Sequence, residues 1–364
     1  MTSSAPSSAS KSAPVVTAEG EAFPSPPARL RYVEVAAPAP GTSVAIAPGV
    51  LWARIPLPIE LSHINVWLLE TERGYVVVDT GMAAMIGKEA WLAIERDVFA
   101  ARPVCAVFVT HIHPDHIGLA GWLQERHGVP VMMSERTHEL ARAFFGGESR
   151  IQPGEAERFF NSQGLTDLSS IQPMLKPDRF GRVTSGVPRV ERHVADGETL
   201  QWGSGWTAMR TDGHAEGHLC LWNAAHQVLI SGDQVLPTIS PNISFGPHTA
   251  DLDPLGSYLS SLERLRKLPA QTLVLPSHGV PFYGLQQRAD DLRGHHEEEL
   301  ATVLAACREP KSAVELLPVM FRRELKGMHL FLALGEALAH AEYLIHAGRM
   351  ERNSSNGIVR YRSG

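Results

Sequence analysis

Short apolar runs, separated by glycine, proline and polar residues, make up most of the chain from about Leu30 onward. In the first half of the chain, runs of strand length lie at residues 50–55, 64–69, 75–79, 104–109 and 129–133. Two stretches with apolar residues at helical spacing, 83–100 and 119–127, lie between these runs. Strands that alternate with helices predict an α/β fold.

A second group of apolar runs follows a long interruption. Between Ser134 and Val190 the strand pattern gives way to mixed helical and loop sequence, so we predict a helical insertion over residues 134–192. Strand-like runs then resume at residues 198–202, 206–211, 218–222, 228–231 and 272–275. Two sets of strands separated by helices predict two facing sheets with helices outside, rather than one doubly wound sheet.

The two ends of the chain differ from this central part. Residues 1–29 are rich in Ser, Ala and Pro and carry too few apolar side chains to order, so we expect a disordered tail. After residue 290 helical spacing dominates, and Asn356-Gly357 marks the turn of a terminal hairpin. We therefore divide the chain into a main domain at 30–290 and a small winged-helix-like domain at 291–364.

Composition excludes several classes of protein. A chain of 364 residues that is 44% hydrophobic can build a large core, and its net charge of −6 argues against binding polyanions by bulk attraction. The three cysteines are far apart in the sequence, which favours reduced thiols. Apolar runs are too short for a membrane-spanning helix, and residues 1–29 lack the pattern of a secretory signal. We therefore expect no membrane association and a cytoplasmic location.

A cluster of metal-binding residue types follows the strand at 104–109. The sequence His111-x-His113-x-Asp115-His116 places imidazoles and a carboxylate within one loop, and these are ligands that zinc prefers. Further downstream, His214, Asp233 and His278 each stand at the end of a predicted strand. Strand ends are rigid positions from which a metal site can be held in geometry, so we expect these residues to converge.

The order of these motifs resembles the metallo-β-lactamase superfamily, in its glyoxalase-II-like pattern. This resemblance implies a four-layer αβ/βα sandwich and a centre with two metal ions, usually Zn²⁺, although Fe and Mn also suit such ligands. By this match, His111, His113 and His214 bind one ion, Asp115, His116 and His278 bind the other, and Asp233 bridges both. The family's aspartate at Asp79 supports the histidine loop without binding metal, and His218 is expected to have a structural role.

The resemblance implies hydrolysis of an ester-type bond by a hydroxide that the two ions hold, with Asp115, His116 and Asp233 in the catalytic centre. Asp233 replaces the cysteine of common zinc β-lactamases, and His113 replaces the glutamate of oxygen-reducing diiron members, so neither activity is expected. A thioester, lactone or other ester of a small acyl substrate is the preferred target. Two alternatives stay open: cleavage of single-stranded RNA, and metal binding without catalysis.

The C-terminal sequence bears on this choice. A small winged-helix-like domain after such a core resembles the lactamase-like-2 group, which includes an endoribonuclease and polyketide thioesterases. The domain has only a small excess of basic residues, so we expect it to pack or to form a homodimer rather than to bind nucleic acid. We expect the insertion at 134–192 to cover the site, where Phe160 and its aromatic neighbours would line an acyl channel. Anionic substrate groups would bind to Arg142, Arg150, Arg158 and Arg179.

Overall fold

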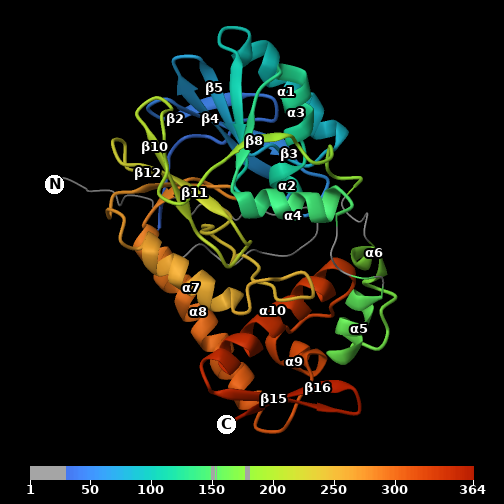
Figure 1. Ribbon diagram of the computed structural model, residues 1–364. Helices are drawn as coiled ribbons and strands as arrows, with labels where there is room; N and C mark the ends of the chain where they lie inside the picture. The colour runs from blue at the N-terminus through green and yellow to red at the C-terminus, as the bar shows by residue number, and fades with distance from the viewer. Residues whose placement is uncertain (1–29, 149–151, 153, 177–180) are drawn as a thin grey trace, which may run out of the picture.

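Two facing β-sheets with helices on their outer faces form the main body of the protein (Figure 1). A computed structural model describes residues 30–148, 152, 154–176 and 181–364. Within these ranges the layers follow the order helix, sheet, sheet, helix, which confirms the predicted α/β sandwich. The tail at 1–29, which we predict to be disordered, lies outside the described residues.

The first sheet comes from the N-terminal half of the chain. Its strands, in spatial order, are β2 (Ser43–Ala47), β3 (Val50–Pro56), β4 (His63–Thr71), β5 (Gly74–Val78), β6 (Val104–Phe108), β7 (Val131–Met133) and β8 (Val190–His193). Strands β2 to β5 are antiparallel, whereas β5 to β8 are parallel. Parallel neighbours need crossover connections. The first two crossovers contain α1 (Met85–Ile94) with the π-helical turn η1 (Glu95–Phe99), and then α2 (Pro114–Ile117) and α3 (Ala120–His127).

The second sheet is mostly antiparallel. Its strands, in spatial order, are β1 (Arg31–Tyr32), β14 (Phe282–Tyr283), β13 (Leu273–Pro276), β12 (Val228–Gly232), β11 (Leu219–Asn223), β10 (Trp206–Arg210) and β9 (Thr199–Leu200). Only β12 and β13 are parallel among these pairs, and α7 (Pro254–Leu265) connects them. Sequence analysis did not predict α7, although its buried Leu255, Tyr258, Leu262 and Leu265 recur at helical spacing.

Three apolar clusters join the layers. The cluster between the sheets contains Trp52, Trp67 and Phe108, all buried. Along β5, Val76 and Val78 point into this cluster, whereas Val77 points to the outer cluster under the first sheet's helices. Both faces of β5 are therefore buried, which explains why its sequence is a continuous apolar run instead of an alternating one.

The C-terminal part consists of three helices and a hairpin. The helices are α8 (Leu285–Ala306), α9 (Ala313–Met320) and α10 (Gly327–His346), and the hairpin strands are β15 (Met350–Ser355) and β16 (Ile358–Ser363). Asn356 and Gly357 have φ angles of 51° and 77°, as a tight turn between twisted strands requires. The domain boundary that we placed at residue 290 falls inside α8, because its helical sequence continues through that position without a break.

The segment at 134–192 is helical over three stretches, and part of it packs in the C-terminal core, whereas its position over the site stays a prediction. It contains α4 (Glu135–Phe145), α5 (Glu155–Ser162) and α6 (Gln172–Leu175), and it ends in β8, which belongs to the first sheet. Phe160 on α5 is buried in the C-terminal core, where its ring lies 5.6 Å from that of Phe331, so it does not line an acyl channel. Figure 1 likewise shows α5 and α6 beside α10.

Two of the four predicted anion-binding arginines lie within the described residues, and each has its own surroundings. Arg142 lies 3.5 Å from Glu148, and Arg158 lines a surface cavity together with Phe159 and Phe245. Arg150 and Arg179 lie outside the described residues. None of the described helices is long and apolar enough to cross a membrane.

Gly118 is the tightest point of the backbone around α2. A Cβ atom added there would lie 2.3 Å from the carbonyl oxygen of Pro114 and 2.7 Å from that of Gly81. We predict that Gly118→Ala lowers the free energy of unfolding by about 1–3 kcal/mol, because backbone atoms must move apart. Gly294→Ala is the control: this helical glycine has open space, so alanine should stabilise by about 1 kcal/mol. Urea unfolding of both variants measures the difference, and equal effects would contradict the packing argument.

Candidate metal centre

The predicted ligands come together at one edge of the two sheets. His111 and His113 lie in the loop after β6, and the short helix α2 carries Asp115 and His116. From the second sheet, the β10–β11 loop supplies His214, and the ends of β12 and β13 supply Asp233 and His278. This convergence follows from the strand directions, because each of these strands ends at the same edge.

Two donor sets form, and Asp233 belongs to both. One set contains His111, His113, His214 and Asp233, and the other contains Asp115, His116, Asp233 and His278. In the first set, His214 Nε2 lies 3.5 Å from Asp233 Oδ2. In the second set, His278 Nε2 lies 3.2 Å from Asp115 Oδ2. A carboxylate shared between two clusters is the arrangement that a pair of metal ions requires.

Four of the donor atoms fit metal ions because they lack other partners. Nε2 of His116, His214 and His278 is buried and has no hydrogen-bond partner among the described residues, and the same holds for Asp233 Oδ1. The opposite ring nitrogens are held in place, since Nδ1 of His214 lies 2.9 Å from the Asn242 carbonyl oxygen and Nδ1 of His278 lies 3.0 Å from that of His63. Metal-binding histidines typically donate their second ring N–H in this way. The clusters are therefore capable of binding a dinuclear metal centre.

The electrostatic surroundings of the two donor sets differ. Burial lowers the pKa of His116, but the carboxylates of Asp233, Asp79 and Asp115 outweigh it and raise this pKa well above its usual value. In contrast, burial and the nearby His214 lower the pKa of His113 to about 3, which leaves its ring neutral and able to bind a metal ion. The carboxylates therefore make the half of the site around His116 favourable for positive charge.

Asp79 holds the histidine loop in place through hydrogen bonds. Its Oδ1 accepts a hydrogen bond from the Thr110 backbone N–H at 2.9 Å, and its Oδ2 lies 2.8 Å from His116 Nδ1. The Thr110 hydroxyl in turn lies 3.0 Å from His111 Nδ1. Asp79 has a φ of 62°, a backbone conformation that Asp and Asn tolerate better than most residues. This side chain belongs to neither donor set and orients members of both.

His218 also lies outside both donor sets. Its Nε2 accepts a hydrogen bond from the backbone N–H of Asp233 at 3.3 Å, and its Nδ1 lies 2.9 Å from the Thr211 hydroxyl. A Cβ atom on Gly232 would lie 2.4 Å from His218 Nε2, so only glycine allows this close approach. The ring positions the backbone that carries the shared carboxylate.

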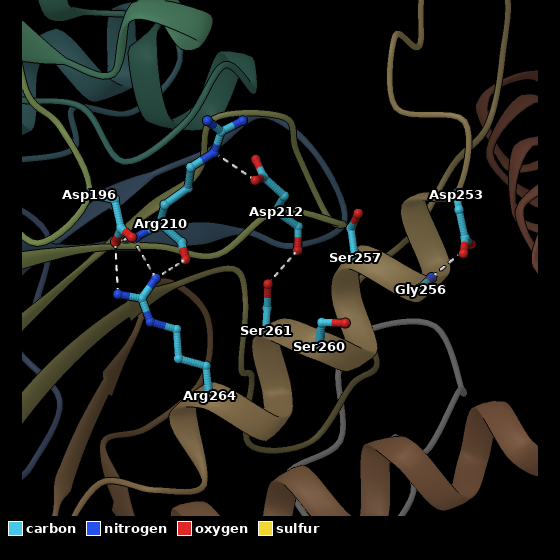
Figure 2. Close-up of a pocket in the computed structure, with 9 residues that line it drawn as sticks. All are labelled: Asp196, Arg210, Asp212, Asp253, Gly256, Ser257, Ser260, Ser261 and Arg264. Carbon is cyan, nitrogen blue, oxygen red and sulfur yellow. Dashed lines mark hydrogen bonds and ion pairs between the residues drawn. The ribbon is translucent and has the colours of Figure 1, made fainter.

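The loop that carries His214 contains Asp212, which contacts Ser261 of α7 and Arg210 of β10 (Figure 2). The Ser261 hydroxyl donates to the Asp212 carbonyl oxygen at 2.9 Å, and Asp212 Oδ1 accepts from the Gly217 backbone N–H at 2.6 Å. The cavity in Figure 2 is lined by paired charges, Arg210 with Asp212 and Arg264 with Asp196, and contains none of the metal-site donors.

Sequence analysis missed the carbonyl groups of His63 and Asn242 that orient His278 and His214. A backbone carbonyl has no side-chain identity, so no motif in the sequence could reveal these contacts. Thr110 was a detectable omission, because a hydroxyl next to the first histidine of the cluster is in reach of both its ring and the supporting aspartate.

The contacts of Asp79 predict an effect on metal affinity. Asp79→Asn keeps the shape and the backbone preference but removes the charge, and it should lower the affinity of the chain for Zn²⁺ by roughly 10- to 100-fold. Competition with a chelator of known affinity measures this change. Asp97→Asn, an exposed position on η1, is the matched control. Equal affinities of the two variants would show that Asp79 does not orient the ligands.

Comparisons with known proteins agree with this geometry. The pattern of the metallo-beta-lactamase superfamily matches residues 59–278, and that of the metallo-beta-lactamase-like C-terminal domain matches residues 300–364. A β-lactamase domain protein from Burkholderia ambifaria, of known structure, is 37% identical, with a TM-score of 0.85 over 92% of this chain and 98% of its own. A metallo-beta-lactamase family protein from Thermus thermophilus is 29% identical, with a TM-score of 0.74 over 88% of this chain and all of its own.

Curated relatives are more distant. The probable metallo-hydrolase YqjP of Bacillus subtilis is 25% identical over 321 residues, which cover 81% of this chain and 92% of its own. The acyl-coenzyme A thioesterase MBLAC2 of Gallus gallus is 28% identical and covers 64% of this chain and 78% of its own. The first family pattern spans more than half of the chain. The protein therefore belongs to the metallo-β-lactamase superfamily, as a metallo-hydrolase with the C-terminal domain of this group.

Proposed function

We propose that this metallo-hydrolase cleaves thioesters or related esters of small acyl substrates. The observation that carries the proposal is a pair of exposed apolar side chains, Ile59 and Met328, on two segments that meet near the contact between His63 and His278. Its support from comparison is the similarity to acyl-coenzyme A thioesterases at 27–28% identity.

Two segments meet beside the second donor set. The loop between β3 and β4 contains His63, whose carbonyl oxygen accepts from His278, and Glu60, whose Oε2 lies 3.3 Å from His329 Nε2 on α10. Ile59 and Met328, the sequence neighbours of this contact, are 44% and 42% exposed. Exposed large apolar side chains on two adjoining segments are suited to an acyl chain, since binding sites for small molecules combine apolar walls with few polar groups.

The residues of the chain have distinct tasks in such a reaction. Two bound divalent ions would supply Lewis acidity and a coordinated water with a pKa of about 7. Burial raises the pKa of Asp115, but His116 and His278 outweigh it and hold the pKa at about 2, so this carboxylate stays ionised as an anionic ligand. Asp233 holds the two clusters at a fixed separation, and Asp79 with Thr110 keeps His111 and His116 oriented. His111, His116 and His278 are buried, and His113 and His214 are partly buried, which limits the access of bulk water.

A substrate panel tests the reaction class. We expect the Zn²⁺-loaded chain to hydrolyse acyl thioesters and aryl esters faster than lactones, and to leave single-stranded RNA intact. His116→Ala should lower kcat for the thioester by on the order of 10²–10³-fold, because it removes a ligand that helps to stabilise charge in the transition state. RNA cleavage that His116→Ala abolishes, without any thioester turnover, would contradict the proposal. Zinc binding without turnover of any substrate would support a non-catalytic protein.

The role of the two exposed apolar residues has its own test. Replacing both Ile59 and Met328 by alanine should raise KM for a hexanoyl thioester roughly 5- to 30-fold, since about 1–2 kcal/mol of apolar burial is lost. The acetyl thioester has too short a chain to contact these two residues, so its KM should not change. Leu252→Ala is the control, because Leu252 is 63% exposed and adjoins Asp253 of the separate cavity in Figure 2. Equal changes for both chain lengths would show that the two residues do not bind the acyl chain.

A further inference from the structure

A second cluster of histidines and a carboxylate lies between two helices of the C-terminal part, apart from the dinuclear donor sets. Helix α8 carries His295, His296 and Glu299, which the spacing of three and four residues places on one face. Helix α10 packs against α8 and brings His340 to the same point. The rings of His296 and His340 are fully buried, and Glu299 is mostly buried.

The donor atoms form a triangle of the size that a small metal ion needs. His340 Nε2 lies 3.0 Å from Glu299 Oε2 and 3.2 Å from His296 Nδ1, and the third side, from His296 Nδ1 to Glu299 Oε2, is 3.7 Å. Ligands about 2.0–2.1 Å from a tetrahedral zinc ion are roughly 3.3–3.4 Å from one another. A fourth donor, His295 Nε2, lies 3.6 Å from the same carboxylate oxygen on the more exposed side.

The hydrogen bond of His340 matches those of two histidines in the metal centre. Nδ1 of His340 lies 2.8 Å from the carbonyl oxygen of Glu336, one turn earlier on α10. When the Nδ1–H group donates a hydrogen bond to this carbonyl oxygen, the Nε2 lone pair of His340 faces the Glu299 carboxylate and His296 Nδ1. His214 and His278 have the same arrangement, with Nδ1 on a backbone carbonyl and Nε2 free for a metal ion.

The cluster also requires a cation. Among the described residues, no hydrogen bond of good geometry reaches the buried Oε2 of Glu299, although His340 Nε2 is close to it. A buried carboxylate in such surroundings is destabilising unless a positive charge compensates it.

We propose that His296, Glu299 and His340 bind a third divalent metal ion, with His295 as the outer ligand. The ion has a structural role, because all donors come from the protein and link α8 to α10. Helix α8 begins next to the second sheet, and Glu336 on α10 lies 3.4 Å from the side chain of Asn242. The carbonyl of Asn242 orients His214, so the ion would hold the C-terminal helices against the dinuclear centre.

Metal content tests this site without reference to activity. The full-length chain is loaded with Zn²⁺, dialysed and analysed for zinc per polypeptide; we expect about three ions. Glu299→Gln, which keeps the size of the side chain, should reduce the content to about two and lower Tm. The matched control is Glu298→Gln, an exposed neighbour on α8, which should retain all three ions. Asp233→Asn should lose zinc from the dinuclear centre and retain the ion at His340.

A proton is the competing cation, and nitrogen NMR distinguishes it from zinc. In the Zn²⁺-loaded wild-type chain we expect the His340 Nε2 signal of a metal-bound imidazole, and removal of zinc should shift that signal. This measurement also applies if Glu299→Gln fails to fold. The proposal is overturned if the wild-type chain holds only two ions, or if His340 gives an imidazolium signal that zinc does not change.

Discussion

The burial of the Asp233 carboxylate between histidine side chains is the constraint on which the rest of the site depends. Its oxygens lie 3.4 Å from His116 Nε2 and 3.5 Å from His214 Nε2, and Oδ1 has no hydrogen-bond partner among the described residues. Such a carboxylate is strongly destabilising unless positive charge surrounds it. It follows strand β12 and lies between ligands from both sheets, so metal ions bound there would stabilise the edge where the two sheets meet.

The surrounding shell consists of groups that orient the ligands without binding metal. Asp79 and Thr110 fix the loop after β6, His218 fixes the backbone of Asp233, and α7 holds the loop of His214. Nearly all of these groups are buried, so their hydrogen bonds are strong. Loss of these hydrogen bonds would change the geometry of the metal ligands. In the cluster around His340, a backbone carbonyl likewise determines which ring nitrogen is free.

Local patterns in the sequence were sufficient for most strands and for the terminal hairpin. The continuous apolar run predicts strand β5, and Asn356-Gly357 predicts the hairpin turn, from local residue chemistry alone. The fate of the segment at 134–192 could not be predicted, because its helices have apolar faces that could pack on several partners. Phe160 joins the C-terminal core through Phe331, a contact between residues far apart in the chain. The domain boundary, which falls inside α8, could not be predicted for a similar reason, since one helix contributes to both domains.

By itself, the sequence determined the kinds of donor atoms, their order and their positions at strand ends, because these follow from short-range periodicity and residue chemistry. Only the tertiary structure decided which nitrogen of each ring is free and which donors share a point in space. His296 and His340 are 44 residues apart and meet only because α8 packs on α10. Contacts of that kind depend on the packing of whole elements and on backbone carbonyls, which have the same chemistry at every residue.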